Sequence, residues 1–226
     1  LDDSNTMEAV KPWRLVPTTF GLGADARMVA FRPHRVQSNR VHRIFDECKR
    51  RGVTSVAIML TNDPDEMIEL AREVRPDILH IAGDGYAADE AFAARLKEAA
   101  PNTKLMQAVL VDDESAVDRA KKYAQYCDFI LTDSGLAPDT GIGASGLTHD
   151  WSIDARIVAE CGKPVIMAGG LGPDNVAEAI EQCKPYGVDS LTKTSIKYDG
   201  GYMEKDIDKV RQFCINADAA AAKIGQ

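Results

Sequence analysis

Phe129-Ile-Leu-Thr-Asp133 and Pro164-Val-Ile-Met-Ala-Gly-Gly-Leu171 are the stretches that decide the fold. Each is an apolar run of strand length; the first ends in a carboxylic acid and the second ends in two glycines and a leucine. A glycine-rich stretch, Gly141-Ile-Gly-Ala-Ser-Gly146, lies between them. Glycines let backbone N–H groups approach an anion closely, and the start of a following helix adds further donors. Two such loops after successive strands predict a phosphate site beside Asp133.

The same unit, an apolar strand followed by an amphipathic helix, repeats along the chain at roughly 25 residues per unit, the rhythm of a (β/α)8 barrel. We expect strands at Met28–Phe31, Val53–Leu60, Ile78–Ala82, Leu105–Val111, Phe129–Thr132, Val165–Ala168 and Val188–Leu191. We expect helices at Pro64–Val74, Glu90–Ala99, Glu114–Tyr123, Ile153–Glu160, Asn175–Gln182 and Lys205–Ile215. Continuous apolar strands alternating with helices predict a parallel sheet buried on both faces. A doubly wound open sheet gives similar local signals, but the repeat favours an α/β TIM barrel.

The barrel accounts for the whole chain, residues 1–226, as one domain. Residues 1–22 form an irregular or remodelled N-terminal unit, because Pro12 and Pro17 interrupt any regular element there. Seven strands are visible, so we expect the first strand either upstream of Leu1 or remodelled within this unit.

Composition excludes several classes of function. The net charge is −8 and the basic residues are interspersed with acidic ones, so we expect no nucleic-acid partner. The five cysteines lack the close spacing of zinc or redox motifs, which indicates reduced thiols in a cytoplasmic protein. The sequence has no apolar run long enough for a membrane span and no signal peptide. It also has no metal-ligand spacing, and we expect neither a metal nor a cofactor.

Four motifs in this order resemble the phosphoribosylanthranilate isomerase family: Leu131-Thr-Asp133, Gly143-Ala-Ser-Gly-Leu-Thr-His-Asp-Trp151, Met167-Ala-Gly-Gly-Leu-Gly-Pro-Asp-Asn-Val-Ala-Glu-Ala-Ile180 and Pro185-Tyr-Gly-Val-Asp189. Upstream, Gly23-Ala-Asp25 and Val56-Ala-Ile-Met-Leu-Thr-Asn62 are similar to the family's second and third units. The resemblance covers about nine-tenths of the chain. It implies a TIM barrel that converts an aminoaldose phosphate to an aminoketose phosphate by an Amadori rearrangement, in tryptophan biosynthesis.

The resemblance also implies roles for particular residues. Asp133 matches the family's general acid, and the phosphate-binding glycine loops correspond to Gly143, Ser145, Gly146, Gly169 and Gly170. The family's base is a cysteine in a Lys-Ile-Cys-Gly motif on the first strand. This sequence lacks that motif, and none of its five cysteines is predicted at a strand end.

Two further positions depart from the family pattern. Where the family has Ser-Ser-Gly after Val-Asp, this chain has Ser190-Leu-Thr-Lys-Thr-Ser195. Lys193 therefore replaces the close backbone approach with a charge, unless it is a solvated surface lysine. Arg35 lies close to the family's arginine for the anthranilate carboxylate, although it is not in the same motif.

Two histidines are weaker candidates. His149 and Asp150 could form an acid/base pair, but adjacent residues rarely face one point, so we expect His149 to order its loop. His80 follows an apolar run, and it either points into the barrel mouth or is a satisfied core histidine.

The sequence thus predicts an enzyme, an aldose–ketose isomerase of the phosphoribosylanthranilate isomerase type, that acts on a small phosphorylated sugar as a monomer or homodimer. Two alternatives stay open. The first is a divergent phosphosugar isomerase or lyase that uses Lys193. The second is a binding protein that retains the phosphate-binding site and has lost catalytic activity.

Overall fold

The computed structural model of this chain describes residues 35–59, 61–82, 85–137, 141–142, 149–198 and 203–225. The predicted strand at Met28–Phe31, the N-terminal unit and most of the loop around Gly143–Gly146 lie outside the described residues. In chain order the elements are α1 (Arg35–Arg50), β1 (Val56–Met59), α2 (Pro64–Val74), β2 (Ile78–Ile81), α3 (Glu90–Ala99), β3 (Lys104–Leu110), α4 (Ser115–Tyr123), β4 (Phe129–Asp133), β5 (Leu136–Ala137), β6 (Gly141–Ile142), α5 (Trp151–Glu160), β7 (Val165–Met167), α6 (Val176–Cys183), β8 (Gly187–Val188), a 3₁₀ turn (Thr192–Thr194), β9 (Ser195–Lys197), β10 (Met203–Lys205) and α7 (Ile207–Lys223).

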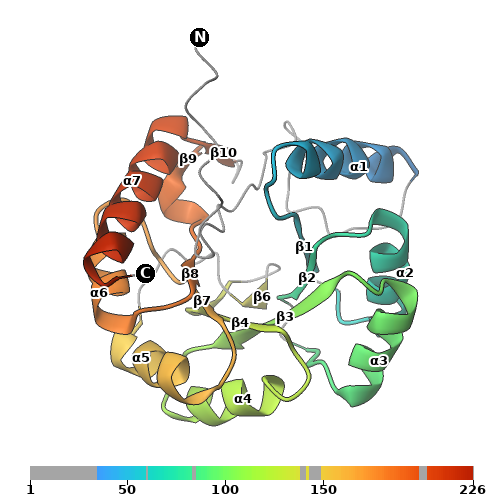
Figure 1. The fold of residues 1–226 in the computed structure, drawn as a ribbon, viewed down its shortest axis with the longest axis horizontal. Helices are drawn as coiled ribbons and strands as arrows, with labels where there is room; N and C mark the ends of the chain where they lie inside the picture. Colours follow the sequence, from blue (N-terminus) through green and yellow to red (C-terminus); the bar gives the residue numbers. More distant parts are fainter. Residues whose placement is uncertain are drawn as a thin grey trace.

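Six parallel strands form one curved sheet in the order β1-β2-β3-β4-β7-β8. Each strand pairs with the next long strand of the chain, without the reversal of strand order that a doubly wound sheet requires. The helices lie in a ring outside this sheet, as Figure 1 shows. The described part is therefore an arc of a (β/α)8 barrel, and the predicted fold class is confirmed.

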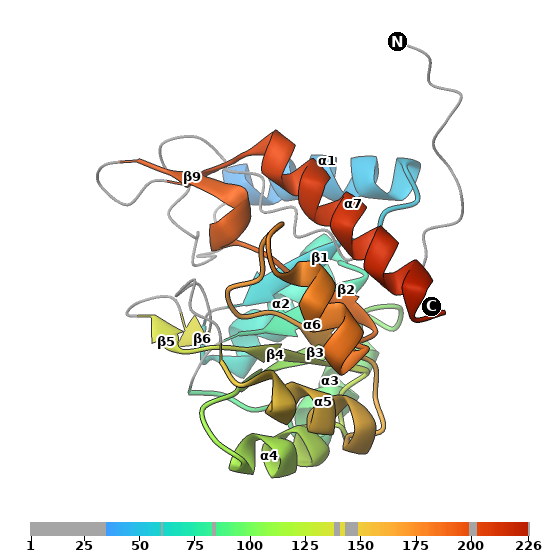
Figure 2. The same cartoon turned by 90° about the vertical axis from the view of Figure 1, so that its left-hand side faces the viewer.

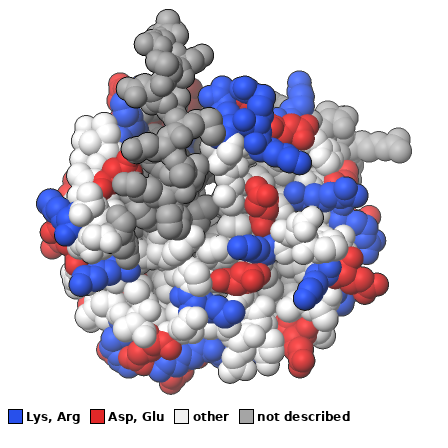
Figure 3. All heavy atoms as spheres, viewed as in Figure 1, with Lys and Arg blue, Asp and Glu red and all other residues white. Residues whose placement is uncertain are grey.

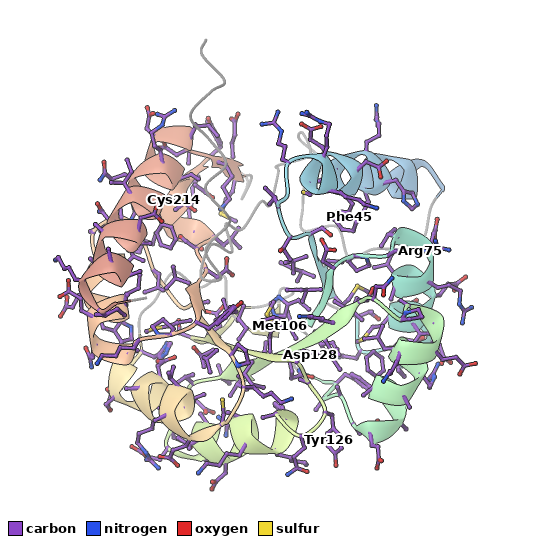
Figure 4. The ribbon with its side chains drawn as sticks, in the orientation of Figure 1. Phe45, Arg75, Met106, Tyr126, Asp128 and Cys214 are labelled. Atoms are coloured by element: carbon purple, nitrogen blue, oxygen red, sulfur yellow. The ribbon has the colours of Figure 1, made fainter. Side chains whose placement is uncertain are left out.

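Alternation along the strands places side chains on the two faces of the sheet. Leu79 and Ile130 point outward and are fully buried against the helices. Fully burying a side chain of this size stabilises the fold by about 1.5–3 kcal/mol. Ile78 and Met106 belong to the cluster on the inner face, and Met106 points into the space that the sheet encloses (Figure 4). A sheet apolar on both faces is what the continuous apolar runs predicted.

Local capping sets the helix boundaries that the sequence predicted best. Asp63 accepts a hydrogen bond from the backbone N–H of Asp65 at 2.8 Å, and Pro64 occupies the first turn. The chain leaves α2 through Arg75, which has the left-handed φ of 48°. Pro64–Val74 was predicted to the residue for these reasons.

The last helix was predicted wrongly at both ends: the prediction stopped at Ile215, but the helix continues to Lys223. Lys205 was expected to begin it, but Lys205 ends β10, where it pairs with Ser195 of β9. Helix α7 begins at Ile207 because the side chain of Asp206 caps the helix by accepting from the N–H groups of Asp208 and Lys209 at 3.2 Å. The hairpin β9–β10 and the long helix α1 were not predicted.

The carboxyl ends of the sheet strands carry the short additional elements. Figure 2 shows β5, β6 and β9 on the side of the sheet where β4 ends. On the face drawn in Figure 3, the described basic side chains are interspersed with acidic ones, without a continuous basic stripe. Of the helices described, none combines the length and apolarity needed to cross a membrane.

Candidate functional site

Asp133 is the last residue of β4, where its half-buried side chain lies at the carboxyl edge of the sheet. The N–H group of Ser134 donates to its Oδ1 at 2.7 Å. Burial raises the pKa of Asp133 to about 7, Asp189 and Asp154 add to this rise, and the Ser134 N–H and His149 oppose it. A carboxyl group with this pKa exists in both protonation states at neutral pH, so it can serve as a proton donor.

The turn after β7 brings two glycines to the same edge. Gly169 and Gly170 have φ values of 88° and 65°, in the left-handed region that favours glycine. The side chain of Asn175 fixes the turn, because it accepts from the N–H of Gly172 at 2.8 Å and donates to the carbonyl of Gly170 at 3.2 Å. Asn175 provides no side-chain cap for α6, which starts at the next residue.

The segment after β8 closes onto this turn. Ser190 Oγ donates to the carbonyl of Leu171 at 2.6 Å, which ties the two strand ends together. The short 3₁₀ turn Thr192–Thr194 follows. Loops after the last two strands together with a short extra helix are the usual phosphate site of TIM barrels.

Lys205 supports this segment from β10 and was missed by the sequence interpretation. Its Nζ donates to the carbonyls of Ser190 and Leu191, both at 3.1 Å, and to Thr194 Oγ1 at 2.9 Å. Burial lowers the pKa of Lys205 to about 8, an effect that Asp189 opposes. Burial likewise raises the pKa of Asp189 to about 6, and Lys205 opposes that rise. Asp189 directly follows β8, so a second carboxyl group lies at this edge.

Lys193 belongs to the 3₁₀ turn after β8 and lies beside the turn that follows β7. Its side chain is exposed. Its Cβ lies 2.8 Å from the position that a Cβ on Gly172 would take, so the lysine stem packs against that glycine. The structure therefore brings Lys193 to the predicted phosphate loops. Arg35 is the first residue of α1, and its predicted role stays a prediction.

The loop with Gly143, Ser145 and Gly146 lies outside the described residues, but both of its flanks are described. On one side, β6 pairs with β5, which starts three residues after Asp133. On the other side, the chain returns at His149. The side chain of His149 is 8% exposed and hydrogen-bonds through Nε2 to Oδ2 of Asp154, which is fully buried.

His149 does not pair with its neighbour Asp150. Asp150 instead caps α5 by accepting from the N–H of Ser152 at 2.9 Å. His149 precedes this cap and Asp154 lies four residues after it, positions at which an apolar pair often contacts across a helix start. The sequence therefore held a signal for the pairing of His149 with Asp154, in the register of the helix cap.

His80 lies on the inner face of the sheet, opposite Met106 in the neighbouring strand. It is 5% exposed, and burial lowers its pKa to about 4. Its Nε2 has no hydrogen-bond partner among the described residues. His80 is thus a neutral, buried histidine inside the barrel, rather than a satisfied core residue.

All five cysteines are described, and none lies at the carboxyl end of a sheet strand. Cys48, Cys183 and Cys214 belong to helices, Cys161 follows α5, and Cys127 precedes β4. Figure 4 places Cys214 on α7. Burial raises the pKa of Cys127 and of Cys183 to about 12, so these thiols stay protonated.

Comparisons with known proteins agree on one family. The sequence profile described as "N-(5'phosphoribosyl)anthranilate (PRA) isomerase" matches residues 22–216. The N-(5'-phosphoribosyl)anthranilate isomerase of Haloferax volcanii is 34% identical over 203 residues, which are 90% of this chain and 85% of that protein. The isomerase of Methanocella arvoryzae is 33% identical over 161 residues, 71% of each chain.

Solved structures agree in fold. The phosphoribosyl anthranilate isomerase of Thermotoga maritima superimposes with a TM-score of 0.63 at 24% identity, covering 80% of each chain. A second solved isomerase has a TM-score of 0.61 at 22% identity over 80% of this chain and 79% of its own. That protein is described in complex with reduced 1-(O-carboxyphenylamino)-1-deoxyribulose 5-phosphate.

Proposed function

This chain belongs to the N-(5'-phosphoribosyl)anthranilate isomerase family of tryptophan biosynthesis, and we propose that it carries out the family's Amadori rearrangement with Asp133 as proton donor. The observation that carries the proposal is the position of Asp133 at the carboxyl end of β4, with a pKa raised to about 7. The substrate is then phosphoribosylanthranilate, and the protein is a cytoplasmic enzyme.

The reaction opens the furanose ring of the substrate. Asp133 donates its proton to the ring oxygen as the bond from that oxygen to the anomeric carbon breaks, and the substrate nitrogen supplies the electron pair for the resulting iminium ion. The carboxylate left behind keeps the hydrogen bond from the Ser134 N–H. A base then removes the proton from the neighbouring carbon, which gives the enol that becomes the aminoketose.

The phosphate of the substrate binds, in this proposal, between the turn after β7 and the segment after β8. We assign three described residues to this phosphate-binding site: Gly169, Gly170 and Lys193. The site is completed by Gly143, Ser145 and Gly146. Gly169 and Gly170 have positive φ values that residues with a Cβ rarely adopt, so the conformation of this turn requires glycine. Support for the site comes from Asn175 and Lys205, which hold the two segments by hydrogen bonds.

A binding protein without catalysis is the second candidate, and one observation favours it. Within the described residues, no cysteine lies at the carboxyl end of a sheet strand, where the family's base is expected. The other alternative, a divergent isomerase or lyase that uses Lys193, is tested by the K193A variant and by borohydride trapping.

Turnover separates the two candidates. We would follow loss of phosphoribosylanthranilate fluorescence with the purified chain, and measure binding of a reduced product analogue in parallel. Turnover that is saturable and lost in D133N supports the isomerase. Tight binding of the analogue with no turnover by the wild-type chain would establish the binding protein instead.

Replacing Lys193 by alanine should raise KM about tenfold and change kcat little, because an exposed ammonium contributes charge to phosphate binding and not to the chemical step. The matched control is K197A, because Lys197 is also exposed and lies nearby on β9. Steady-state kinetics measure KM and kcat of each variant. Borohydride treatment of the wild-type chain with substrate tests separately for an imine at Lys193. A substrate adduct at Lys193, or a collapse of kcat in K193A, would contradict the isomerase assignment.

Replacing Lys205 by methionine should weaken substrate binding and lower stability together. The variant leaves Ser190 O, Leu191 O and Thr194 Oγ1 without their shared donor. Losing such buried hydrogen bonds costs about 1–3 kcal/mol of unfolding free energy. Urea unfolding with and without inorganic phosphate measures both effects, and a K205M protein as stable and as phosphate-responsive as wild type would refute the supporting role.

A further inference from the structure

A buried, hydrogen-bonded polar pair occupies a place in the fold where apolar contact is usual. His149 lies before the cap of α5 and Asp154 lies in its first turns, and together they close the helix start. Two apolar side chains would close it equally well, and replacing a buried ion pair by such residues is often neutral or stabilising. Helix formation alone therefore does not explain the pair.

The pair is also incompletely satisfied. Among the described residues, neither Nδ1 of His149 nor Oδ1 of Asp154 has a hydrogen-bond partner, although both atoms are buried. Unpaired buried polar atoms destabilise a fold, and in native proteins they call for an explanation such as a catalytic role. Nδ1 is the free edge of the imidazole, because Nε2 is engaged by Asp154.

That free edge lies at Gly169, in the turn after β7. The position that a Cβ on Gly169 would take lies 2.8 Å from His149 Nδ1 and 2.8 Å from Ser134 Oγ. The imidazole and the Ser134 hydroxyl therefore both pack against this glycine. The backbone N–H of Ser134 donates to the carboxyl of Asp133. His149 thus packs against the same glycine as the residue that follows Asp133.

In the described part of the chain, three titratable side chains affect the pKa of Asp133. Asp189 faces it from the end of β8, while His149 and Asp154 face it from the start of α5; Lys205 interacts with Asp189. His149 is the one side chain of this set that favours the carboxylate form of Asp133. Removing His149 should therefore raise the pKa of Asp133.

We propose that His149, held by Asp154, is a positioning residue for Asp133: it packs with Ser134 against Gly169 and so fixes the turn that follows Asp133. This inference rests on the proposed function for the role of Asp133 as acid. The packing of His149 at this turn does not depend on turnover, and it has its own test.

The test is a titration of Asp133 by carboxyl 13C NMR, with the signal assigned from the spectrum of D133N. H149Q keeps a donor for Asp154 but removes the imidazole that lowers the pKa of Asp133, so we expect Asp133 in this variant to titrate higher than in wild type by about 0.5–1 pH unit. H149F/D154L replaces the pair by an apolar contact that preserves folding, and it should shift Asp133 in the same direction.

D150A is the matched control, because it removes the neighbouring cap of α5 and leaves the pair intact. It should lower the melting temperature without moving the Asp133 titration. The alkaline limb of kcat/KM should follow the NMR shift in H149Q. An unchanged Asp133 titration in H149Q and in H149F/D154L would overturn the inference, even if both variants were less stable. Failure of wild-type turnover would refute the proposed function alone, since the NMR titration needs no substrate.

Discussion

Asp133→Asn lowers kcat on phosphoribosylanthranilate by a factor on the order of 10² to 10⁴, the usual contribution of a general acid. The amide has nearly the volume of the carboxyl and still accepts the hydrogen bond from the Ser134 N–H. It has no acidic proton to donate to the ring oxygen. Binding of a product analogue should therefore stay close to wild type, because the substitution leaves the phosphate segments untouched.

The matched control is Asp128→Asn. Asp128 precedes the same strand at its opposite end, where its Oδ2 accepts from the N–H of Leu105 at 2.9 Å (Figure 4). An asparagine there keeps an acceptor, so kcat should be unchanged. Stopped assays on both variants over a pH series would decide the point. Turnover of D133N within a few-fold of wild type would make Asp133 a structural residue.

The same substitution should stabilise the fold at alkaline pH. The folded-state pKa of Asp133 is raised to about 7 from an ordinary value of 3.8, so the folded protein binds more protons than the unfolded chain between these values. Ionising Asp133 in the folded state therefore destabilises the wild type as the pH rises from about 4 to about 7, and the penalty is complete above that range. D133N lacks the penalty and should be more stable than wild type at pH 8, by about 1 kcal/mol or more. Urea unfolding at pH 4 and pH 8 measures the difference, which should nearly vanish at the lower pH.

A variant that gains unfolding free energy while it loses kcat, as we expect of D133N, indicates that the carboxyl group is kept for function. A carboxyl kept for folding would be placed where its charge is solvated or paired, as Asp63 is at the start of α2. Asp133 is half-buried near a second carboxyl group, Asp189, and both pKa values are raised. This arrangement costs folding free energy, so it points to chemistry at the end of β4.

Local rules were sufficient to predict most strands and helices of the sheet from the sequence, and the repeat of the strand–helix unit together with the family resemblance selected the barrel. Helix α2 has its cap, its first-turn proline and its apolar spacing within a dozen residues, and its bounds were correct at both ends. Strands such as β4 were recognisable because both faces of the sheet are buried, which makes the apolar run continuous. Each of these signals depends only on neighbours along the chain.

The parts of the site that depend on distant contacts could not be predicted in this way. Lys205 was assigned to a helix because nothing near it in the sequence indicates that it reaches back to Ser190 and Leu191. The bond between His149 and Asp154 is local, and it was missed because Asp150 was considered as the partner of His149 and the register of the helix cap was not used. Asp133 was predicted by its position at a strand end, a signal that is again local.

Gly169→Ala should be among the most disruptive single changes in this site, and Gly162→Ala measures how much of the effect is backbone strain. Both glycines have a left-handed backbone, with φ of 88° and 72°. An alanine in this region costs about 1 kcal/mol through strain at either position. Around Gly162 there is nothing within 4 Å of the new Cβ, so strain is the whole expected loss there.

At Gly169 the new methyl group would overlap with three atoms. It would lie 2.8 Å from Cε1 and Nδ1 of His149 and from Oγ of Ser134. His149 cannot move away without breaking its bond to the buried Asp154. Overpacking of this kind adds about 1–3 kcal/mol, so we expect G169A to lose about 2–4 kcal/mol of unfolding free energy.

Urea unfolding of the two variants at one pH gives the comparison directly. G169A should lose at least twice the free energy that G162A loses, and its kcat should fall because the turn carrying Asp133 is displaced. G162A should keep the wild-type kcat, since Gly162 lies after α5 at the opposite edge of the sheet, before β7 begins. Equal losses in the two variants would mean that His149 and Ser134 yield freely to the methyl group. The junction over Gly169 would then be soft, and it could not hold a proton donor in position.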